Sequence, residues 1–337
     1  LDAPTQSVER SSWAVRRAGL KLHLRRPRLT PEVKRLGWVI LPATFGAGIY
    51  QISQFVDTFF ATSLPQGSLT LLKMADRLNQ MPLGIVGIAL GTAILPMLSR
   101  HIQSGDAKEA QRLQGNAFEM ATLLTLPAAA ALAICAPAFV NAFFVGGKFK
   151  PEDGMIMAQI TMALVAGLPA YVIVKILSPG FFARSDTRTP VYTALAALIV
   201  NIALNIFFIW GLNWGIVGLA GATAISASLN CLLLYAILHK RGWFRFTGDL
   251  GGRIFRQLIA TAAMSVELWW LMGTLFEHFS GSVVERIWSL LLLVLSGLGV
   301  YGAVGWLVGA VDKTEINQLL RRRKATPQSV SETEANS

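Results

Sequence analysis

The stretch Leu71–Pro96, LLKMADRLNQMPLGIVGIALGTAILP, combines a long apolar run with charged and amide side chains in its first turns. The sequence around it is apolar enough for membrane helices. A charged side chain near the centre of such a helix costs about 2.5–3.5 kcal/mol on insertion scales. We therefore expect these side chains to face protein or water and to serve a function. They are Lys73, Asp76, Arg77, Asn79 and Gln80.

The composition indicates an all-α, polytopic membrane protein. Of 337 residues, 53% are hydrophobic and only 15% are charged, whereas a globular chain has about 25% charged residues. The mean hydropathy is +0.50. The net charge of +11 comes from short basic clusters between apolar runs, so it does not predict a nucleic-acid partner.

Eight apolar runs are each long enough to cross roughly 30 Å of hydrocarbon. Of the 30 Lys and Arg, 24 lie in alternate connections, and the opposite connections hold only Lys148, Lys150 and Arg286. The positive-inside rule therefore places both ends in the cytosol. The predicted runs are 36–64, 69–99, 113–140, 154–181, 190–210, 215–238, 254–276 and 285–311.

Proline and glycine fall inside many of these runs, and we expect them to interrupt the helices. The positions include Pro82 with Gly84 and Gly87, Pro127, Gly167 and Pro179. Such a density is typical of transporters, whose discontinuous helices bend around a site near the midplane.

Polar side chains in the first two runs form candidate binding surfaces. Gln51, Ser53, Gln54, Asp57 and Thr58 share one sector of a helix. In the second run, Lys73 and Arg77 are four residues apart, as are Asp76 and Gln80, which predicts a cationic ridge beside an acidic one. Two interpretations stay open: Lys73 snorkels to the interface and Asp76 pairs internally, or these groups contact a substrate.

Other polar residues leave similar alternatives. Lys175 either snorkels or lines a cavity, and Asn201, Asn205 and Asn230 either bridge helices or serve a site. Cys135 and Cys231 lack metal-ligand spacing, so no metal site is expected. No GxSxG, Walker or HExxH pattern occurs, so we do not expect an enzyme or a cofactor.

The motifs ADRLNQMPLGIVGIALGTAILPMLSR (75–100) and VKILSPGFFARSDTRTPV (174–191) resemble those of the MurJ, or MviN, family of lipid II flippases. That family belongs to the multidrug, oligosaccharidyl-lipid and polysaccharide exporter superfamily. The resemblance runs from about Trp13 to Val311. It implies translocation of lipid II, an undecaprenyl-diphosphate-linked muropeptide used in peptidoglycan biosynthesis, across the bacterial inner membrane by alternating access.

The resemblance also implies a domain organisation. Segment 1–35 would be a basic cytosolic connection, 36–240 the six-helix second lobe, 241–311 two additional helices, and 312–337 a polar tail. The two additional helices would form a groove for the lipid tail, with a stripe at Gly297, Gly299, Gly302 and Gly305. Family members have fourteen helices, so we expect a chain without the first lobe, either a fragment, a misplaced start or part of a split protein, that is inactive alone.

The resemblance further implies the roles of single residues. Arg77 would contact the diphosphate with Asp76 beside it. The polar residues singled out above from the sequence itself complete the predicted substrate site: Lys73, Gln80, Gln54 and Lys175. A sodium ion would lie nearest to Asp57, Asn201 and Asn205. Asn205 is neutral where an acidic ligand would be expected, which argues against sodium coupling in this chain. The partners implied are lipid II, membrane lipids and the absent first lobe.

Two other functions are open from the sequence. A cation-coupled drug exporter of the same superfamily would have a cavity dominated by carboxylates. A scaffold half that does not transport would bind a partner through its surface. Arg77→Ala should abolish a flippase, Asp57→Asn should impair a cation antiporter more, and neither should affect a scaffold.

Overall fold

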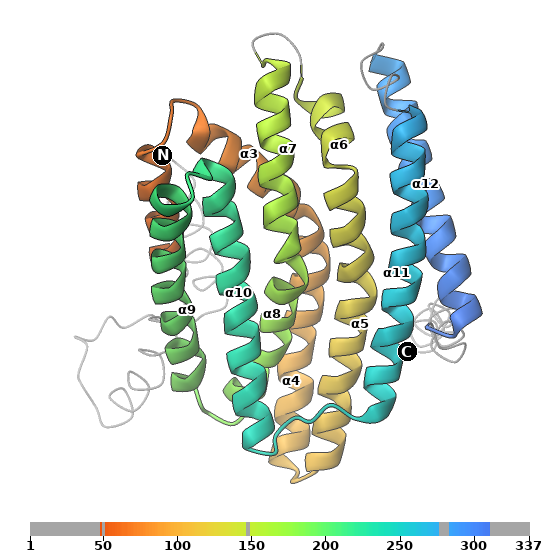
Figure 1. Cartoon of the computed structure of the whole chain (residues 1–337). Coiled ribbons are helices and arrows are strands. Elements are labelled where there is room, and N and C mark those ends of the chain that lie inside the picture. The colour runs from red at the N-terminus through yellow and green to blue at the C-terminus, as the bar shows by residue number, and fades with distance from the viewer. Residues whose placement is uncertain (1–47, 49–50, 146–148, 276–282, 311–337) are drawn as a thin grey trace, which may run out of the picture. The chain divides into compact units, whose positions relative to one another are not determined.

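The computed structural model describes residues 48, 51–145, 149–275 and 283–310, all of which fall in the compact unit Pro42–Ser337. The predicted segments 1–35 and 312–337 and the first part of the run 36–64 lie outside the described residues. The elements are helices, drawn in Figure 1. They comprise residues 51–62, α3 (Ser68–Pro82), η1 (Leu83–Ile88), α4 (Ala89–Gln103), α5 (Ala107–Ile134), α6 (Ala136–Phe143), α7 (Pro151–Ala166), α8 (Leu168–Phe182), α9 (Arg188–Ile206), η2 (Phe207–Gly211), α10 (Gly215–Lys240), α11 (Gly248–Leu275) and α12 (Val283–Val308).

Within the described residues, six helical stretches are long and apolar enough to cross a membrane. They confirm the predicted class and match six of the eight predicted runs. The predicted run 254–276 is α11, which is helical but is not one of the six, so the number eight is not confirmed. The six stretches are Ser68–Gln103, Ala107–Ile134, Pro151–Phe182, Arg188–Gly211, Gly215–Lys240 and Val284–Val308.

The predicted interruptions occur at some of the proline and glycine positions only. After Pro82 the helix widens into the π-helical segment η1, and α7 and α8 meet at Gly167. A Cβ on Gly167 would lie 2.9 Å from Ala224 Cα, so glycine permits α10 to approach this junction closely. The prediction is wrong for Pro127 and Pro179, since α5 and α8 continue past them. Neighbouring groups in a helical bundle can accommodate the backbone hydrogen bond that proline removes.

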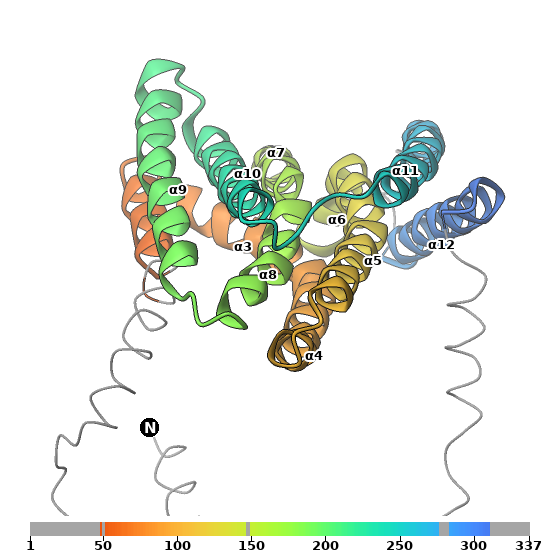
Figure 2. The ribbon, with the colours of Figure 1, turned by 90° about the horizontal axis from the view of Figure 1, so that it is seen from below.

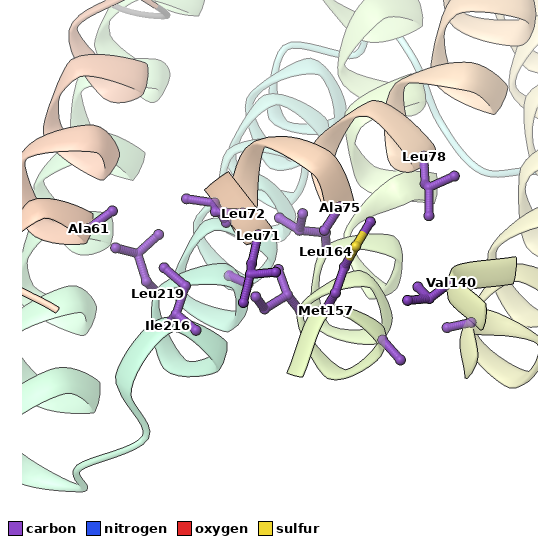
Figure 3. Close-up of a cluster of buried hydrophobic side chains, with 14 of the residues drawn as sticks. Ala61, Leu71, Leu72, Ala75, Leu78, Val140, Met157, Leu164, Ile216 and Leu219 are labelled. Carbon is purple, nitrogen blue, oxygen red and sulfur yellow. The ribbon is translucent and has the colours of Figure 1, made fainter. Parts of the chain in front are cut away.

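The apolar core explains why α3 turns its charges outward. Leu71, Ala75 and Leu78 repeat at helical spacing and are buried, and they pack with Met157 of α7 and Leu219 of α10 (Figure 3). Residues three and four apart share one face of a helix. The polar side chains between them must therefore point away from this core.

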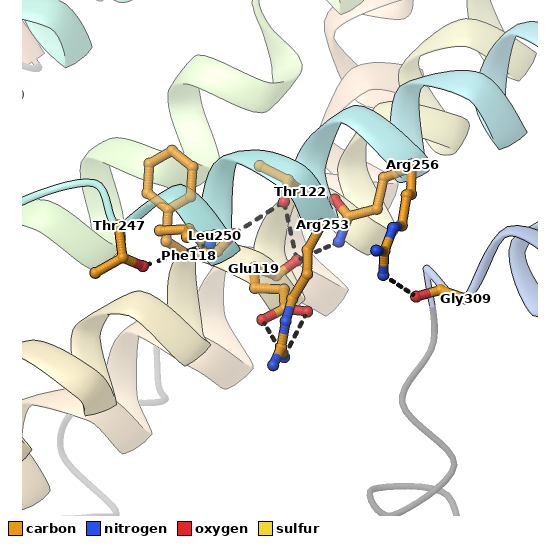
Figure 4. A network of polar contacts seen from close by, with 9 residues as sticks. Phe118, Glu119, Thr122, Thr247, Leu250, Arg253, Arg256 and Gly309 are labelled. Atoms are coloured by element: carbon orange, nitrogen blue, oxygen red, sulfur yellow. Dashed lines mark hydrogen bonds and ion pairs between the residues drawn. The ribbon is translucent and has the colours of Figure 1, made fainter.

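Polar contacts fasten the α11–α12 pair to the rest of the unit. Arg253 Nη1 lies 3.2 and 3.1 Å from the two carboxylate oxygens of Glu119 on α5 (Figure 4). The Tyr301 hydroxyl of α12 donates to the Leu123 carbonyl at 2.8 Å. The pair also packs against α5 and α6, at one edge of the described helices (Figure 2).

The glycine stripe of α12 has two different surroundings. A Cβ on Gly297 would lie 3.2 Å from Leu268 Cδ2, so this glycine serves the contact with α11. Gly299 and Gly302 have no atom within 4 Å of such a Cβ. The lipid-tail groove implied by the resemblance stays a prediction, and Gly297 contributes to helix packing.

The connections that carry basic residues contact one another at one end of the helices. Gln111 near the start of α5 donates to the Gly242 carbonyl at 2.8 Å, and Arg241 after α10 pairs with Asp186 between α8 and α9. This arrangement agrees with the predicted distribution of basic residues, in which alternate connections lie on the same side of the membrane. The assignment of this end to the cytosol stays a prediction.

Candidate functional site

A cavity of about 670 Å³ lies among residues 51–62, α3, α8, α9 and α10. Its volume is in the range of about 300–1,000 Å³ that ligand sites usually have. The described residues that line it carry two carboxylates, Asp57 and Asp76, and one cation, Lys175. The uncharged polar residues of the lining are Ser53, Gln54, Asn79, Gln80, Tyr171, Ser178, Thr187, Thr223, Ser226 and Asn230.

The α3 wall of the cavity presents a carboxylate held by an amide. Gln80 Nε2 donates to Asp76 Oδ2 at 2.6 Å, as their four-residue spacing allows. Asp76 is half-buried, and both side chains line the cavity. The structure thus brings these two predicted residues together, and their contact with a substrate stays a prediction.

The side chain of Lys175, which lines the cavity, packs against the backbone of a glycine in η1. A Cβ added to Gly87 of η1 would lie 3.1 Å from Lys175 Cδ and 3.6 Å from Cε. The bare backbone at Gly87 therefore leaves space for the aliphatic part of the lysine side chain. Of the two alternatives left by the sequence, the structure places Lys175 in the cavity lining.

The cationic ridge of α3 lies elsewhere. Lys73 and Arg77 are exposed, and neither is among the described residues that line the cavity. Lys73 Nζ is 3.4 Å from Gln54 Oε1, which links α3 to the helix over residues 51–62. The predicted site is thus divided between the cavity wall and an exposed face of α3.

A buried polar cluster borders the cavity, whose lining includes two of its members, Asp57 and Thr223. Asn205 Nδ2 donates to Asp57 Oδ1 and to Asn201 Oδ1, at 3.2 Å in both cases. The Thr223 hydroxyl lies 3.2 Å from Asp57 Oδ2 and 3.0 Å from the Leu219 carbonyl. Asp57, Asn201 and Asn205 are 7%, 1% and 0% exposed. The three residues that the resemblance assigned to an ion are therefore in one network.

This network fits a sodium ion poorly in the observed arrangement. Sodium is a hard cation that needs several oxygen ligands. Both carboxylate oxygens of Asp57 and the side-chain oxygen of Asn201 instead accept hydrogen bonds. Asn205 Oδ1 is buried and has no hydrogen-bond partner among the described residues.

An ion-pair network, here called the 186–241 clasp, connects the α8–α9 connection with the end of α10. The Asp186 carboxylate accepts hydrogen bonds from Thr189 N at 3.0 Å, from Thr189 Oγ1 at 2.6 Å and from Arg241 Nη1. Partial burial opposes ionisation of Asp186, but these hydrogen bonds together outweigh it and hold the pKa of the carboxyl below its ordinary value.

The clasp also contains stacked side chains. The Cζ atoms of Arg184 and Arg241 lie 4.8 and 4.7 Å from the ring centroid of Trp243, at cation–π distance. Phe182 and Thr187, which flank Arg184 in sequence, line the cavity. The 186–241 clasp therefore borders the cavity at the end where the basic connections meet.

Thr223 and Gly87 are two of the contributors to the site that sequence reasoning missed. Thr223 carried no signal, because threonine in an apolar helix commonly bonds the carbonyl four residues earlier, as it does here. Gly87 was recognised only as a position that could interrupt a helix. Its contact with Lys175 depends on how α8 packs against η1, and no local pattern reports that packing.

Apolar spanning helices around a polar cavity define a polytopic membrane protein of the transporter type. The sequence model of the family described as lipid II flippase MurJ matches residues 12–289. This match covers most of the chain, and the chain belongs to that family. It is thereby a multi-pass protein of the bacterial inner membrane.

Individual relatives agree with the family match. A probable lipid II flippase MurJ of Rhizobium meliloti (strain 1021) is 38% identical over 311 residues, which are 92% of this chain and 58% of the relative. That of Rhizobium tropici is 36% identical over 319 residues, or 94% and 59%. The chain thus spans a little over half the length of these relatives.

Solved structures show the same fold. A lipid II flippase MurJ in an inward closed conformation superposes with a TM-score of 0.65 at 23% identity, over 84% of this chain and 56% of that one. An outward-facing multidrug resistance MATE family transporter of the MOP superfamily gives a TM-score of 0.52 at 18% identity, over 78% and 62%.

Proposed function

We propose that this chain forms the second lobe and the C-terminal helix pair of a flippase, which moves lipid II from the cytoplasmic to the periplasmic leaflet without chemical conversion. Family membership supports this function. So does a cavity of about 670 Å³ with polar walls among helices apolar enough to cross a membrane. Alternating access to such a cavity carries a polar headgroup across the bilayer.

The charge of the substrate sets what the protein has to provide. A diphosphate carries about two negative charges, and moving one charge into hydrocarbon costs several kcal/mol unless it is paired and solvated. We assign Lys175, Asp76, Gln80 and Gln54 to contacts with the headgroup, since all four line the cavity. The exposed cations of α3 would meet the diphosphate where the first lobe of the assembled flippase faces α3.

Complementation tests this proposal. The chain is expressed in cells depleted of their own lipid II flippase, alone and together with the part of the Rhizobium meliloti relative that the chain does not match. Survival and exposure of lipid II on the outer leaflet are measured. We expect rescue only when both parts are present, and failure of the inserted and co-assembled pair would contradict the proposal.

Single replacements locate the anion contact within the same assay. Lys175→Gln removes the one cation among the described lining residues and should abolish rescue, whereas Lys175→Arg keeps the charge and should retain most of it. Arg77→Ala should also abolish rescue through the exposed face of α3. Unchanged rescue by both charge-removing variants would place the diphosphate elsewhere.

A second candidate, cation-coupled export of amphiphilic cations, is favoured by one observation. The described lining carries the carboxylates of Asp57 and Asp76 and lacks Lys73 and Arg77. In this case Asp57→Asn should impair transport more than Arg77→Ala, and cells expressing the assembled protein should extrude a cationic dye. Insensitivity to both replacements would instead indicate a scaffold.

The orientation of the chain is part of the proposal. The connections that contain Arg184 and Arg241 would face the cytosol, together with both ends of the chain. A cysteine placed at exposed Ser185 should react with a membrane-impermeant reagent only after the inner membrane is opened. Labelling of intact spheroplasts at Ser185→Cys would reverse the orientation.

A further inference from the structure

The nitrogen of one amide stands between two oxygens in the buried polar cluster. Asn205 Nδ2 is 3.2 Å from Asp57 Oδ1 and 3.2 Å from Asn201 Oδ1. Thr223 Oγ1 approaches the other carboxylate oxygen at 3.2 Å. A cation that joined the oxygens of Asp57 and Asn201 would need the place that this nitrogen occupies.

We propose that Asn205 determines the ion dependence of this chain: its amide nitrogen takes the place of a sodium ion and keeps the cluster in a cation-free form. Asn205 donates to one carboxylate oxygen of Asp57, and the Thr223 hydroxyl shares its single proton between the other oxygen and the Leu219 carbonyl. A buried charge that accepts hydrogen bonds on both oxygens can persist without a counter-ion in contact with it.

The competing arrangement is a half-turn of the same amide. It would bring Asn205 Oδ1, which now has no hydrogen-bond partner among the described residues, against the oxygens of Asp57 and Asn201. Three oxygens can meet in this way only around a cation or a shared proton. Entry of sodium would therefore break both hydrogen bonds from Asn205 Nδ2. Asp57 would then be the one carboxylate of this cluster that could bind the ion.

An acidic residue at position 205 should reverse this preference. Aspartate has no amide N–H to donate, and at 0% exposure it would place a second carboxylate beside Asp57. Two neighbouring carboxylates repel each other unless a proton or a cation lies between them. Asn205→Asp should thus convert a cluster that does without sodium into one that requires it.

The test uses thermal unfolding of the purified full chain in sodium, potassium or choline chloride at equal concentration. The wild-type protein should have the same Tm in all three salts. The Asn205→Asp variant should unfold at a lower temperature in potassium and regain at least about 3 °C in sodium, because a ligand that binds only the folded state raises its stability. Asn230→Asp is the matched control: it adds a carboxylate to the lining about two helical turns beyond Thr223 on α10 and should show no preference for sodium.

The outcomes decide the proposal without any transport assay, so its failure is distinct from failure of the proposed flippase. A sodium-specific rise in the Tm of the wild-type protein overturns it, and so does a folded Asn205→Asp variant that responds equally to all salts. If Asn205→Asp does not fold in any salt, the Tm values of the wild-type protein and of Asp57→Asn in the three salts decide the proposal instead. Equal Tm values in all salts for both then support the proposal, and a sodium response that Asp57→Asn removes refutes it.

Discussion

Replacing Arg241 by glutamine removes the cation that pairs with Asp186 in the 186–241 clasp, and the burial of the two side chains sets the size of the effect. The side chains of Asp186 and Arg241 are 19% and 38% exposed. Exposed ion pairs contribute about 0.2–1 kcal/mol, whereas breaking a buried pair costs about 3–5 kcal/mol. Because solvent screens the more exposed arginine, we expect a coupling energy of about 1 kcal/mol between the two residues.

A double-mutant cycle isolates this energy from the other contacts of the arginine. Asp186→Asn keeps a side-chain oxygen for the backbone N–H of Thr189, so it removes mainly the charge. Both proteins of the cycle that carry Arg241→Gln lack the cation–π contact of Arg241 with Trp243, so this contact cancels in the coupling energy. The coupling energy then measures the interaction of Arg241 with Asp186, including the part carried by the Thr189 hydroxyl, which donates to Asp186 and accepts from Arg241.

The two cysteines of the chain provide the assay. Cys135 is 2% exposed and Cys231 is half-buried, so a thiol-reactive dye should label them mainly after unfolding. Denaturant curves of the four proteins yield the coupling energy. A value below about 0.3 kcal/mol, within the error of additivity, would refute the argument from burial and geometry.

The same pair predicts how stability depends on pH. The pKa of Asp186 is lowered in the folded protein. The contribution of the ionised Asp186 carboxylate to the free energy of unfolding should therefore be complete above its unfolded-state pKa of about 3.9. It should be lost as the pH falls toward the lower pKa of the folded state. The stability difference between the wild-type protein and Asp186→Asn should stay constant above about pH 5 and shrink in more acidic solution. An unchanged difference at low pH would contradict this assignment.

Two further predictions concern glycines that permit close contacts. Gly87→Ala should displace Lys175 by a few tenths of an ångström and reduce rescue in the complementation assay, with little loss of stability because the lysine side chain is flexible. Gly84→Ala, in the same π-helical segment and without a neighbour within 4 Å, should behave as the wild type, and equal rescue by both variants would contradict the role of Gly87. Gly167→Ala should destabilise the protein by about 2–3 kcal/mol in the dye assay, because its Cβ would meet the backbone of α10. Gly221→Ala has open space and should cost nothing, and a Gly167→Ala variant of equal stability would contradict the close approach.

Hydropathy predicted the spanning helices well because it depends on composition over many residues. The predicted run 69–99 corresponds to Ser68–Gln103, and 190–210 to Arg188–Gly211. Boundaries were less predictable where caps determine them. Asp106 accepts a hydrogen bond from Glu109 N and begins α5 at Ala107, several residues before the predicted run 113–140.

The candidate site was predictable in residue type and only partly in place. The four-residue spacing of Asp76 and Gln80 predicted that both lie on one face of a helix, and the structure shows the hydrogen bond between them there. The position of Arg77 relative to the cavity depends on how α3 packs against α7 and α10. Spacing along one helix does not contain that information. The neighbours Asp57 and Asn205 were found through the family resemblance, because 148 residues separate them in the chain.

The π-helical segment η1 changes the rotational phase of the span Ser68–Gln103. Each of its turns holds about one residue more than an α-helical turn, which amounts to a rotation of about 100°. A helical wheel that fits α3 therefore assigns the wrong faces to α4. A cysteine-accessibility scan along this span should show two periodic patterns with a phase jump between Leu83 and Ile88, and labels chosen from a single wheel would report on the wrong side of the helix.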